Sequence, residues 1–568
     1  MDQKIIKIIF VLAACATFFY IIGNSHRTAN LLLINGTVYT LDAKNSVGQA
    51  IAIRGSRVLT VGSTEELSRQ YTADTVIDLQ GKAVMPGFID GHGHMLNEGR
   101  FLFEIDLMGT SSPQQIPDML ARKVQSSKKG EWIFGRGWDQ NLWEVKEFPK
   151  HELIDNVSPD NPVILQRVDG HAFLANKKAM ELAGISSATK DPAGGKILRD
   201  AKGNPTGVFI DDAMDIIYKI VPHFTDEQIE QRLKLALDQC LKYGLTEVHD
   251  MGGAFDKWGV DLQTIRVYKK LIDNGEWPLR IYAALDRSEE TWGYYLQHGP
   301  EIDYGSGLLT IRSIKLYIDG ALGSRGAALI EEYSDDPGNR GSTRMSDQEI
   351  ELICSAALEK GFQVCTHAIG DRGNHIMLNE YEKVLSTLPK NSPSPRWRIE
   401  HVQVLDQQDI PRFQQLGILP SMQPVHATSD MYWAEARLGQ NRIRGAYAWR
   451  SLLQTGAIIV GGSDFPFEAV SPINGFYAAF TRSDRSGYPQ DGWYREQKMT
   501  REEAARCFTQ WPAYGAFQEN MKGTIEPGKW ADLTILSNDI MQVPPKDVLT
   551  TEVEMTMIGG KIVYQKSR

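Results

Sequence analysis

The chain has 568 residues, of which 42% are apolar and 23% are charged, as in ordinary soluble globular enzymes. Its formal net charge of −10 is modest for this length, and it carries no Lys/Arg-rich stripe, which excludes nucleic acid as a partner. Five cysteines without any Cys-x-x-Cys spacing argue against a disulfide scaffold and against a cysteine-type zinc ribbon.

Residues 1–27 have the pattern of a signal peptide or a membrane anchor. Lys4 and Lys7 precede an uninterrupted apolar run over 8–22, and cations before such a run place the amino terminus on the cytoplasmic side. We expect export, with the remaining chain on the periplasmic or extracellular face, anchored to the membrane through this segment alone.

Both ends of the remaining chain are predicted to form short strands between glycine turns. Residues 28–85 and 522–568 alternate β-branched and polar residues, which is typical of strands. Neither stretch is long enough for a sandwich by itself. We therefore predict one small β-sandwich domain built from both ends.

Residues 86–521 follow a different rhythm, in which a helix, a glycine and an apolar strand succeed one another. Capping-box patterns begin helices over 225–241 and 346–361, and a third helix is predicted over 447–454. Helices that alternate with apolar strands indicate an α/β fold with a parallel sheet.

A closed (β/α)8 TIM barrel explains this rhythm best. A doubly wound open sheet would alternate in the same way, but it would not bring the first and last strands to one centre. The segment 107–223, rich in Trp, Gly and Pro, predicts a subdomain inserted after the first barrel strand.

Residues of the kinds that bind metals follow several of the apolar runs. His92 and His94 are separated by one residue, so on a strand they point to the same side. Such a pair by itself is often only a polar rim. His367, His401 and Asp464 end three later runs in the same way, and in a barrel all five would lie at the carboxyl ends of strands. The repetition favours a metal site.

The run Ser313–Ala321 alternates cleanly and directs Lys315 into the barrel, opposite the apolar side chains that meet the outer helices. Two interpretations remain open. Lys315 is an ammonium paired with Asp319 or a nearby acid, or it is an amine that carbon dioxide carbamylates, giving an anion that bridges two metal ions.

With these residues, the chain resembles the amidohydrolase superfamily, and within it the amidohydrolase family 3 branch that includes N-substituted formamide deformylase-like proteins. The resemblance covers nearly everything from about Ala29 to Tyr564. The matching motifs are Pro-Gly-Phe-Ile-Asp-Gly-His92-Gly-His94, Gly-Trp138-Asp139-Gln, Arg167-Val-Asp-Gly-His171, Lys315-Leu-Tyr-Ile-Asp319-Gly-Ala-Leu-Gly-Ser-Arg325, Thr-His367-Ala-Ile-Gly-Asp371, Glu-His401, Ser-Met-Gln423-Pro-Val-His426 and Gly-Gly-Ser-Asp464-Phe-Pro.

The resemblance implies a set of roles. His92 and His94 hold one divalent metal, His367 and His401 a second, Lys315 bridges the two ions, and Asp464 binds metal and handles protons. Zinc is the expected ion, as one or two Zn²⁺. His426 is assigned a catalytic role, and substrate binding is assigned to Trp138, Asp139, His171, Asp319, Arg325, Asp371 and Gln423. Gly91 replaces the serine of the usual motif, which should alter packing rather than ligation.

The implied reaction is hydrolysis of a non-peptide amide bond, with water activated by the metal and with Asp464 passing a proton to the departing nitrogen. We expect a small N-substituted amide with an apolar substituent, cleaved to a carboxylic acid and an amine. A single-metal deaminase is an alternative, against which Lys315 argues. An exported binding protein on the same fold is another, against which the complete ligand set argues. The sequence leaves a homo-oligomer open.

Overall fold

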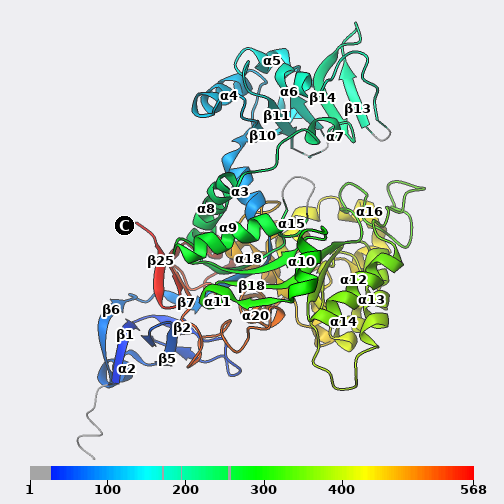
Figure 1. Ribbon diagram of the computed structural model, residues 1–568. Coiled ribbons are helices and arrows are strands. Elements are labelled where there is room, and N and C mark those ends of the chain that lie inside the picture. The colour runs from blue at the N-terminus through cyan, green and yellow to red at the C-terminus, as the bar shows by residue number, and fades with distance from the viewer. Residues whose placement is uncertain (1–26, 169, 171, 193–194, 254–257, 568) are drawn as a thin grey trace, which may run out of the picture. The chain divides into compact units, whose positions relative to one another are not determined.

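The computed structural model describes residues 27–567 except 169, 171, 193–194 and 254–257, and the chain divides into two compact units (Figure 1). Unit 1 consists of the described parts of 1–94 and 237–568, and unit 2 of residues 95–236. The predicted leader lies outside the described residues apart from Arg27. No helix of the described part is both long and apolar enough to cross a lipid bilayer.

Unit 1 is built around a nearly closed sheet of parallel strands. In the described residues the strand order is β22-β21-β20-β19-β18-β16-β15-β8, with the short β17 (Glu301–Asp303) beside β18. The strands of this order are β8 (Phe88–Gly93), β15 (Leu245–Asp250), β16 (Arg280–Leu285), β18 (Leu309–Tyr317), β19 (Gln363–Ala368), β20 (Arg398–His401), β21 (Leu419–Met422) and β22 (Val460–Gly461). The predicted α/β fold with a barrel of parallel strands is confirmed at this level.

Backbone hydrogen bonds join the first strand to the segment that follows the last strand. The amide of Asp464 donates to His92 O at 2.8 Å, and the amide of His94 donates to Phe465 O at 3.0 Å. The buried Asp90 carboxylate reinforces the join, because it accepts hydrogen bonds from the amides of His92 and Ser463, each at 3.0 Å. The sheet therefore closes at the residues that end β8 and follow β22.

Gly91 permits this closure. A Cβ atom at Gly91 would lie 2.5 Å from Gly461 O and 2.5 Å from a methyl carbon of Val460, closer than real Cβ atoms approach such neighbours. The departure from the serine of the usual motif is thus a matter of packing between β8 and β22.

The barrel helices begin and end largely where their capping residues predict. In α8 (Asp226–Lys242) the Thr225 and Gln228 side chains exchange hydrogen bonds with each other's backbone. In α12 (Asp347–Lys360) Ser346 and Glu349 form the same box, and Gly361 ends the helix at a φ of 80°. The helix α17 (Trp449–Gln454) begins two residues later than predicted, because Tyr447 adopts a φ of 50°.

The described part of unit 1 also contains the α-helices α2 (Thr64–Gln70), α9 (Leu262–Asp273), α10 (Thr291–His298), α11 (Tyr304–Gly307), α13 (Asp371–Leu385), α14 (Ile410–Leu416), α15 (Pro424–Asp430), α16 (Ala434–Arg442), α18 (Pro472–Thr481), α19 (Arg501–Cys507), α20 (Gln510–Gly515) and α21 (Pro545–Val548).

Two further sheets of unit 1 contain the strands nearest to both ends of the described chain. One has the order β5-β4-β1-β6 and the other the order β25-β24-β23-β7-β2-β3. Their strands are β1 (Arg27–Ile34), β2 (Thr37–Tyr39), β3 (Val47–Gly48), β4 (Ala50–Arg54), β5 (Arg57–Gly62), β6 (Tyr71–Asp78), β7 (Ala83–Pro86), β23 (Leu533–Leu536), β24 (Val553–Ile558) and β25 (Lys561–Gln565). Leu31, Ile51, Val84, Leu533 and Met555 share one apolar core. Strands from both ends thus occupy one sheet.

Unit 2 has its own sheet and its own core. The sheet has the order β13-β14-β12-β11-β10-β9, and Trp138, Leu165 and Leu174 lie in the apolar cluster. Its strands are β9 (Ile105–Asp106), β10 (Ile133–Trp138), β11 (Val163–Arg167), β12 (Ala172–Ala175), β13 (Gly195–Arg199) and β14 (Pro205–Asp211), and its α-helices include α3 (Met95–Phe103), α4 (Gln115–Ser126), α5 (Glu152–Asp155), α6 (Lys177–Leu182) and α7 (Asp215–Tyr218).

Replacement of Gly91 by alanine tests the close approach of β8 and β22. The added methyl group overfills the contact, so Gly91→Ala should lower the free energy of unfolding by about 1–3 kcal/mol in urea denaturation. Gly293→Ala is the matched control, because Gly293 lies within α10 and an added Cβ finds its nearest neighbour 3.8 Å away. The control should keep or raise stability, by about 0.5–1 kcal/mol. Equal stability of Gly91→Ala and the wild type would contradict the packing described here.

Candidate metal centre

The polar residues that end the barrel strands meet at one place in unit 1. His92 lies in β8, Lys315 in β18, His367 in β19 and His401 in β20, while Asp464 follows β22. His94 follows β8 directly, and His426 lies in α15, just after β21. Every one of these side chains except His426 is buried. The sequence-predicted ligands are thus together at the carboxyl ends of the strands.

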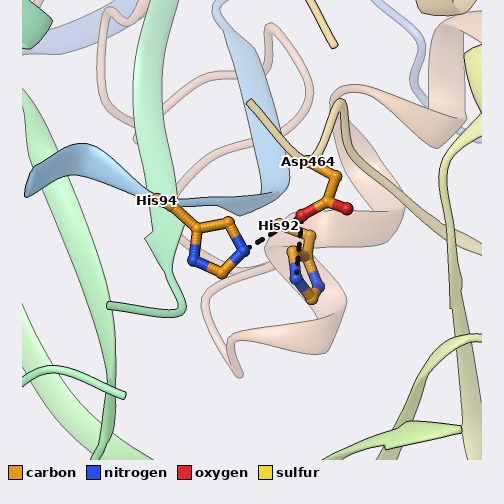
Figure 2. A group of neighbouring side chains, drawn as sticks. All are labelled: His92, His94 and Asp464. Carbon is orange, nitrogen blue, oxygen red and sulfur yellow. Dashed lines mark hydrogen bonds and ion pairs between the residues drawn. The ribbon is translucent and has the colours of Figure 1, made fainter. Parts of the chain in front are cut away.

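The first group consists of His92, His94 and Asp464 (Figure 2). Asp464 Oδ1 lies 3.0 Å from His94 Nε2 and 3.5 Å from His92 Nε2. The other nitrogen of each ring is occupied: His94 Nδ1 lies 2.6 Å from Gly252 O, and His92 Nδ1 lies 2.6 Å from Glu400 Oε2. Because a carbonyl and a carboxylate only accept, both Nδ1 atoms donate, and it is the Nε2 atom of each ring that faces Asp464.

The second group consists of His401, His426 and the same Asp464. Asp464 Oδ2 lies 3.5 Å from His426 Nε2 and 4.0 Å from His401 Nδ1. The predicted second pair was His367 with His401. Their ring centroids are 4.6 Å apart, although His367 belongs to neither compact donor group.

His367 nevertheless has a nitrogen that lacks a partner. Its Nε2 is buried and has no hydrogen-bond partner among the described residues, although Asp319 Oδ1 lies 3.5 Å away. The ring stacks on Tyr317 with a centroid separation of 3.7 Å. A buried nitrogen without a hydrogen bond is costly, and a metal ion would satisfy it.

Burial keeps three of the imidazoles neutral. It lowers the pKa of His92, His367 and His401 well below the ordinary histidine range, and Lys315 nearby lowers the pKa of His92 and His367 further. Neutral imidazole is the form that binds a metal ion. The pKa values therefore favour ligation over ion pairing.

The backbone is strained at two of the candidate ligands. His401 has a φ of 75° and Asp464 a φ of 63°, conformations that residues other than glycine rarely adopt. Strain of this kind costs of order 1–3 kcal/mol and is concentrated at functional sites. Here it occurs at two of the three residues of the second donor group.

Lys315 is buried beside the first group. Its Nζ lies 3.3 Å from His92 Nε2, and burial lowers the pKa of the amine. Asp319, the predicted partner of an ammonium, accepts instead from the backbone amides of Ala328, Ile369 and Gly370 at 2.8–3.0 Å.

A cavity of about 430 Å³ opens beside the centre within unit 1. Its lining includes His94, Lys315, His367, His401, His426 and Asp464. Aromatic rings form a wall next to these polar groups: Trp258 stacks on Tyr317 at 5.4 Å and on Phe467 at 6.4 Å between centroids. The volume is that of a small-molecule site.

The predicted substrate-binding residues of unit 1 lie outside this lining, as far as the described residues define it. Gln423 Oε1 lies 2.9 Å from His401 Nδ1, and Arg325 forms an ion pair with Asp335 at 2.9 Å. Asp371 accepts from the amide of Ile330 at 2.8 Å. Their role in substrate binding remains a prediction.

The other predicted substrate-binding residues belong to the inserted segment. Trp138 is buried in the core of unit 2 and donates from Nε1 to Leu165 O at 2.6 Å. Asp139 pairs with Arg167 at 3.0 Å. His171 lies outside the described residues. For these residues too the assigned role remains a prediction.

Sequence reasoning missed the aromatic wall and the carboxylate behind His92. Glu400 precedes the predicted ligand His401, and its position two residues after Arg398 places both charged side chains on one side of a buried strand. This spacing was the available signal. No sequence pattern indicated the aromatic wall, because Trp258 and Phe467 follow different strands.

Comparison with known proteins agrees with this geometry. The amidohydrolase family matches residues 75–564. The YtcJ protein of Bacillus subtilis (strain 168) is 34% identical over 544 residues, 94% of this chain and 99% of that protein. The N-substituted formamide deformylase of Arthrobacter pascens is 25% identical over 569 residues, 95% and 99% of the two chains. The crystal structure of an uncharacterized metal-dependent hydrolase from Pyrococcus horikoshii OT3 matches with a TM-score of 0.75 and 28% identity, over 91% and 99% of the chains. The predicted resemblance is confirmed, and the chain belongs to the amidohydrolase family.

Proposed function

We propose that this amidohydrolase is a metal-dependent enzyme that hydrolyses the carbon–nitrogen bond of a small N-substituted amide and releases a carboxylic acid and an amine. The observation that carries the proposal is the convergence of imidazoles on both oxygens of Asp464, beside a cavity. The family and the metal-dependent hydrolase from Pyrococcus horikoshii support the class of reaction.

The histidine and aspartate donors of this centre fit divalent metal ions. His92, His94 and Asp464 would hold one ion, and His367 and His401 a second, with the unpartnered Nε2 of His367 available for it. Imidazole and carboxylate donors suit zinc, which needs no redox partner. His426, close to Asp464 Oδ2, is a further donor or a group that polarises the substrate carbonyl.

We propose that Lys315 is carbamylated and bridges the two ions. A buried amine with a lowered pKa is available to react with carbon dioxide. The resulting carbamate is an anion, whereas an ammonium 3.3 Å from His92 Nε2 would repel a metal ion.

The chain's own residues supply the proton transfer. When bound, a divalent ion polarises a carbonyl and makes water nucleophilic near neutral pH. Asp464 lies between the two donor groups, so its carboxylate can take a proton from the attacking water and deliver it to the departing nitrogen. Protonation of that nitrogen is required because an amide anion is a very poor leaving group.

The lining of the cavity supports an apolar substituent on the substrate. Trp258, Tyr317, Leu322, Trp433 and Phe467 provide a largely aromatic surface next to the polar centre. The N-substituted formamide deformylase relative acts, by its name, on a substrate of this class.

We further propose the division into a composite β-domain of residues 28–85 and 522–568 and a barrel of residues 86–521 that carries the insertion 107–223. The six-stranded sheet shared by both ends and the separate compactness of residues 95–236 support this division. Export and membrane anchoring through residues 1–27 remain a proposal from the sequence.

Substitution of Asp464 tests the proton transfer. Asp464→Asn should lower the rate of substrate hydrolysis by roughly 10²–10⁴-fold, because the side-chain carboxamide of asparagine cannot accept a proton from water. The measurement is amine release at saturating zinc, with the bound metal counted by elemental analysis. Asp273→Asn, an exposed carboxylate on α9, should leave the rate unchanged. Full activity of Asp464→Asn would remove Asp464 from the mechanism.

A substrate panel tests the class of reaction. Zinc-loaded protein should hydrolyse small formamides or amides with an apolar N-substituent faster than N-acyl amino acids or cyclic amides, because the cavity wall is aromatic. Amine and acid release by chromatography gives the rates. Release of ammonia from heterocyclic amines, with no turnover of any amide, would favour the single-metal deaminase instead.

The state of Lys315 is open to direct observation. Anomalous diffraction from zinc-loaded crystals should show two ions, with extra density on Lys315 Nζ between them. The variant Lys315→Met, which cannot form the carbamate, should retain at most one ion. A single metal beside an unmodified Lys315 in the wild type would contradict the bridge.

A further inference from the structure

The interior of the barrel holds a run of charged and polar side chains for which the proposed reaction has no use. Glu247, His249, Arg398 and Glu400 are each at most 1% exposed. Buried charges are costly unless they are paired. In the described structure these residues contact one another in series, and the series ends at His92.

Glu400 is the member that contacts the metal centre. Its Oε2 lies 2.6 Å from His92 Nδ1, and both side chains are fully buried. A carboxylate can only accept at this distance, so the proton of the neutral imidazole resides on Nδ1. The lone pair is then on Nε2, the nitrogen that faces Asp464 and Lys315.

Arg398 holds Glu400 in this position. Its Nη2 donates to Glu400 Oε2 at 3.0 Å, and its Nε lies 2.8 Å from Oε1. The same Nη2 lies 2.6 Å from the carbonyl of Gly91, the residue before His92. Arg398 therefore fixes both the backbone that carries His92 and the carboxylate that orients its ring.

The series continues away from the centre. Arg398 Nη1 donates to His249 Nδ1 at 2.8 Å, and His249 Nε2 lies 3.1 Å from Glu247 Oε1. Glu247 in turn forms an ion pair with the buried Lys522. Arg398 and Lys522 thus each lie beside a buried carboxylate, which lowers the cost of burying the series.

The other histidine of the first group is held differently. His94 Nδ1 contacts a backbone carbonyl, that of Gly252, rather than a side chain. Of these two histidines, His92 is the one whose Nδ1 contacts a carboxylate in the described structure. A carboxylate partner makes an imidazole a stronger metal ligand than a carbonyl does.

We propose that Glu400, clamped by Arg398, is a positioning residue that fixes the tautomer and orientation of His92 and thereby sets the affinity of the site for its metal ion. The inference rests on the metal centre of the proposed function. It assigns to Glu400 no contact with substrate.

The test is zinc affinity of the full-length protein, measured by competition with a chromophoric chelator. Glu400→Gln should bind zinc 10- to 100-fold more weakly, because the neutral amide strengthens His92 less and can itself donate to Nδ1, which moves the ring proton to Nε2. Cobalt provides a second readout: the visible absorption of the cobalt-loaded variant should differ from that of the wild type.

Asp532→Asn is the matched control. Asp532 is also a buried carboxylate paired with an arginine, Arg280, at 2.7 Å, but Arg280 begins β16 at the end of the strand remote from the site. This variant should lose stability in thermal unfolding and keep the zinc affinity and cobalt spectrum of the wild type. If Glu400→Gln does not fold, the double variant Arg398→Met with Glu400→Gln removes both charges together and should show the same weakening of zinc binding.

An unchanged zinc affinity and cobalt spectrum in folded Glu400→Gln, or in the double variant, would overturn the positioning role. So would an equal loss of zinc affinity in Asp532→Asn, which would reduce the effect to general destabilisation. Zinc binding is measured without substrate, so failure to hydrolyse amides leaves this result intact. Failure of the wild type to bind zinc or cobalt would remove both proposals.

Discussion

The join between the first and last barrel strands is the constraint on which the centre depends. The backbone amide of Asp464 donates to the carbonyl of His92. The hydrogen bond that closes the sheet thus joins two candidate metal ligands, one from each side of the join. Asp90 ties the same two segments together through Ser463. Because a shift by one residue in a strand turns every side chain to the opposite face, this register fixes which side chains enter the centre. The sheet thus positions His92, Lys315, His367 and His401 directly, and the hydrogen bond to His92 O holds Asp464 beside them.

Much of the site could be predicted because strand alternation is a local property. The spacing of His92 and His94, and the burial of Lys315 opposite Ile314 and Leu316, follow from a period of two residues and need no knowledge of neighbours. The helix boundaries at Ser346 and Gly361 are equally local, since a capping box and a left-handed glycine act within one turn. The last strand was harder. β22 has only two residues, and Asp464, three residues beyond it, has a φ of 63°.

What the sequence could not provide is the choice of partners across elements. Alternation places Arg398 and Glu400 inside the barrel. It does not reveal that Arg398 holds Glu400 against His92. His426 lies on a helix and meets Asp464 only because α15 follows the neighbouring strand of a closed sheet. Long-range contacts of this kind depend on the tertiary fold, and the amino-acid sequence alone does not determine them.

The position of β7 has a consequence for synthesis of the protein. β7 lies between β2 and β23, and Ala83 to Pro86 pair with Leu536 to Leu533, although the entire barrel separates these segments along the chain. A ribosome that adds about 5–20 residues per second needs on the order of a minute to pass from one to the other. Throughout that interval one hydrogen-bonding edge of β7 has no partner strand, and an open edge is a template for pairing with other chains. Translation that stops anywhere in the barrel leaves the edge open permanently, so truncated products should be prone to aggregation from their amino-terminal strands.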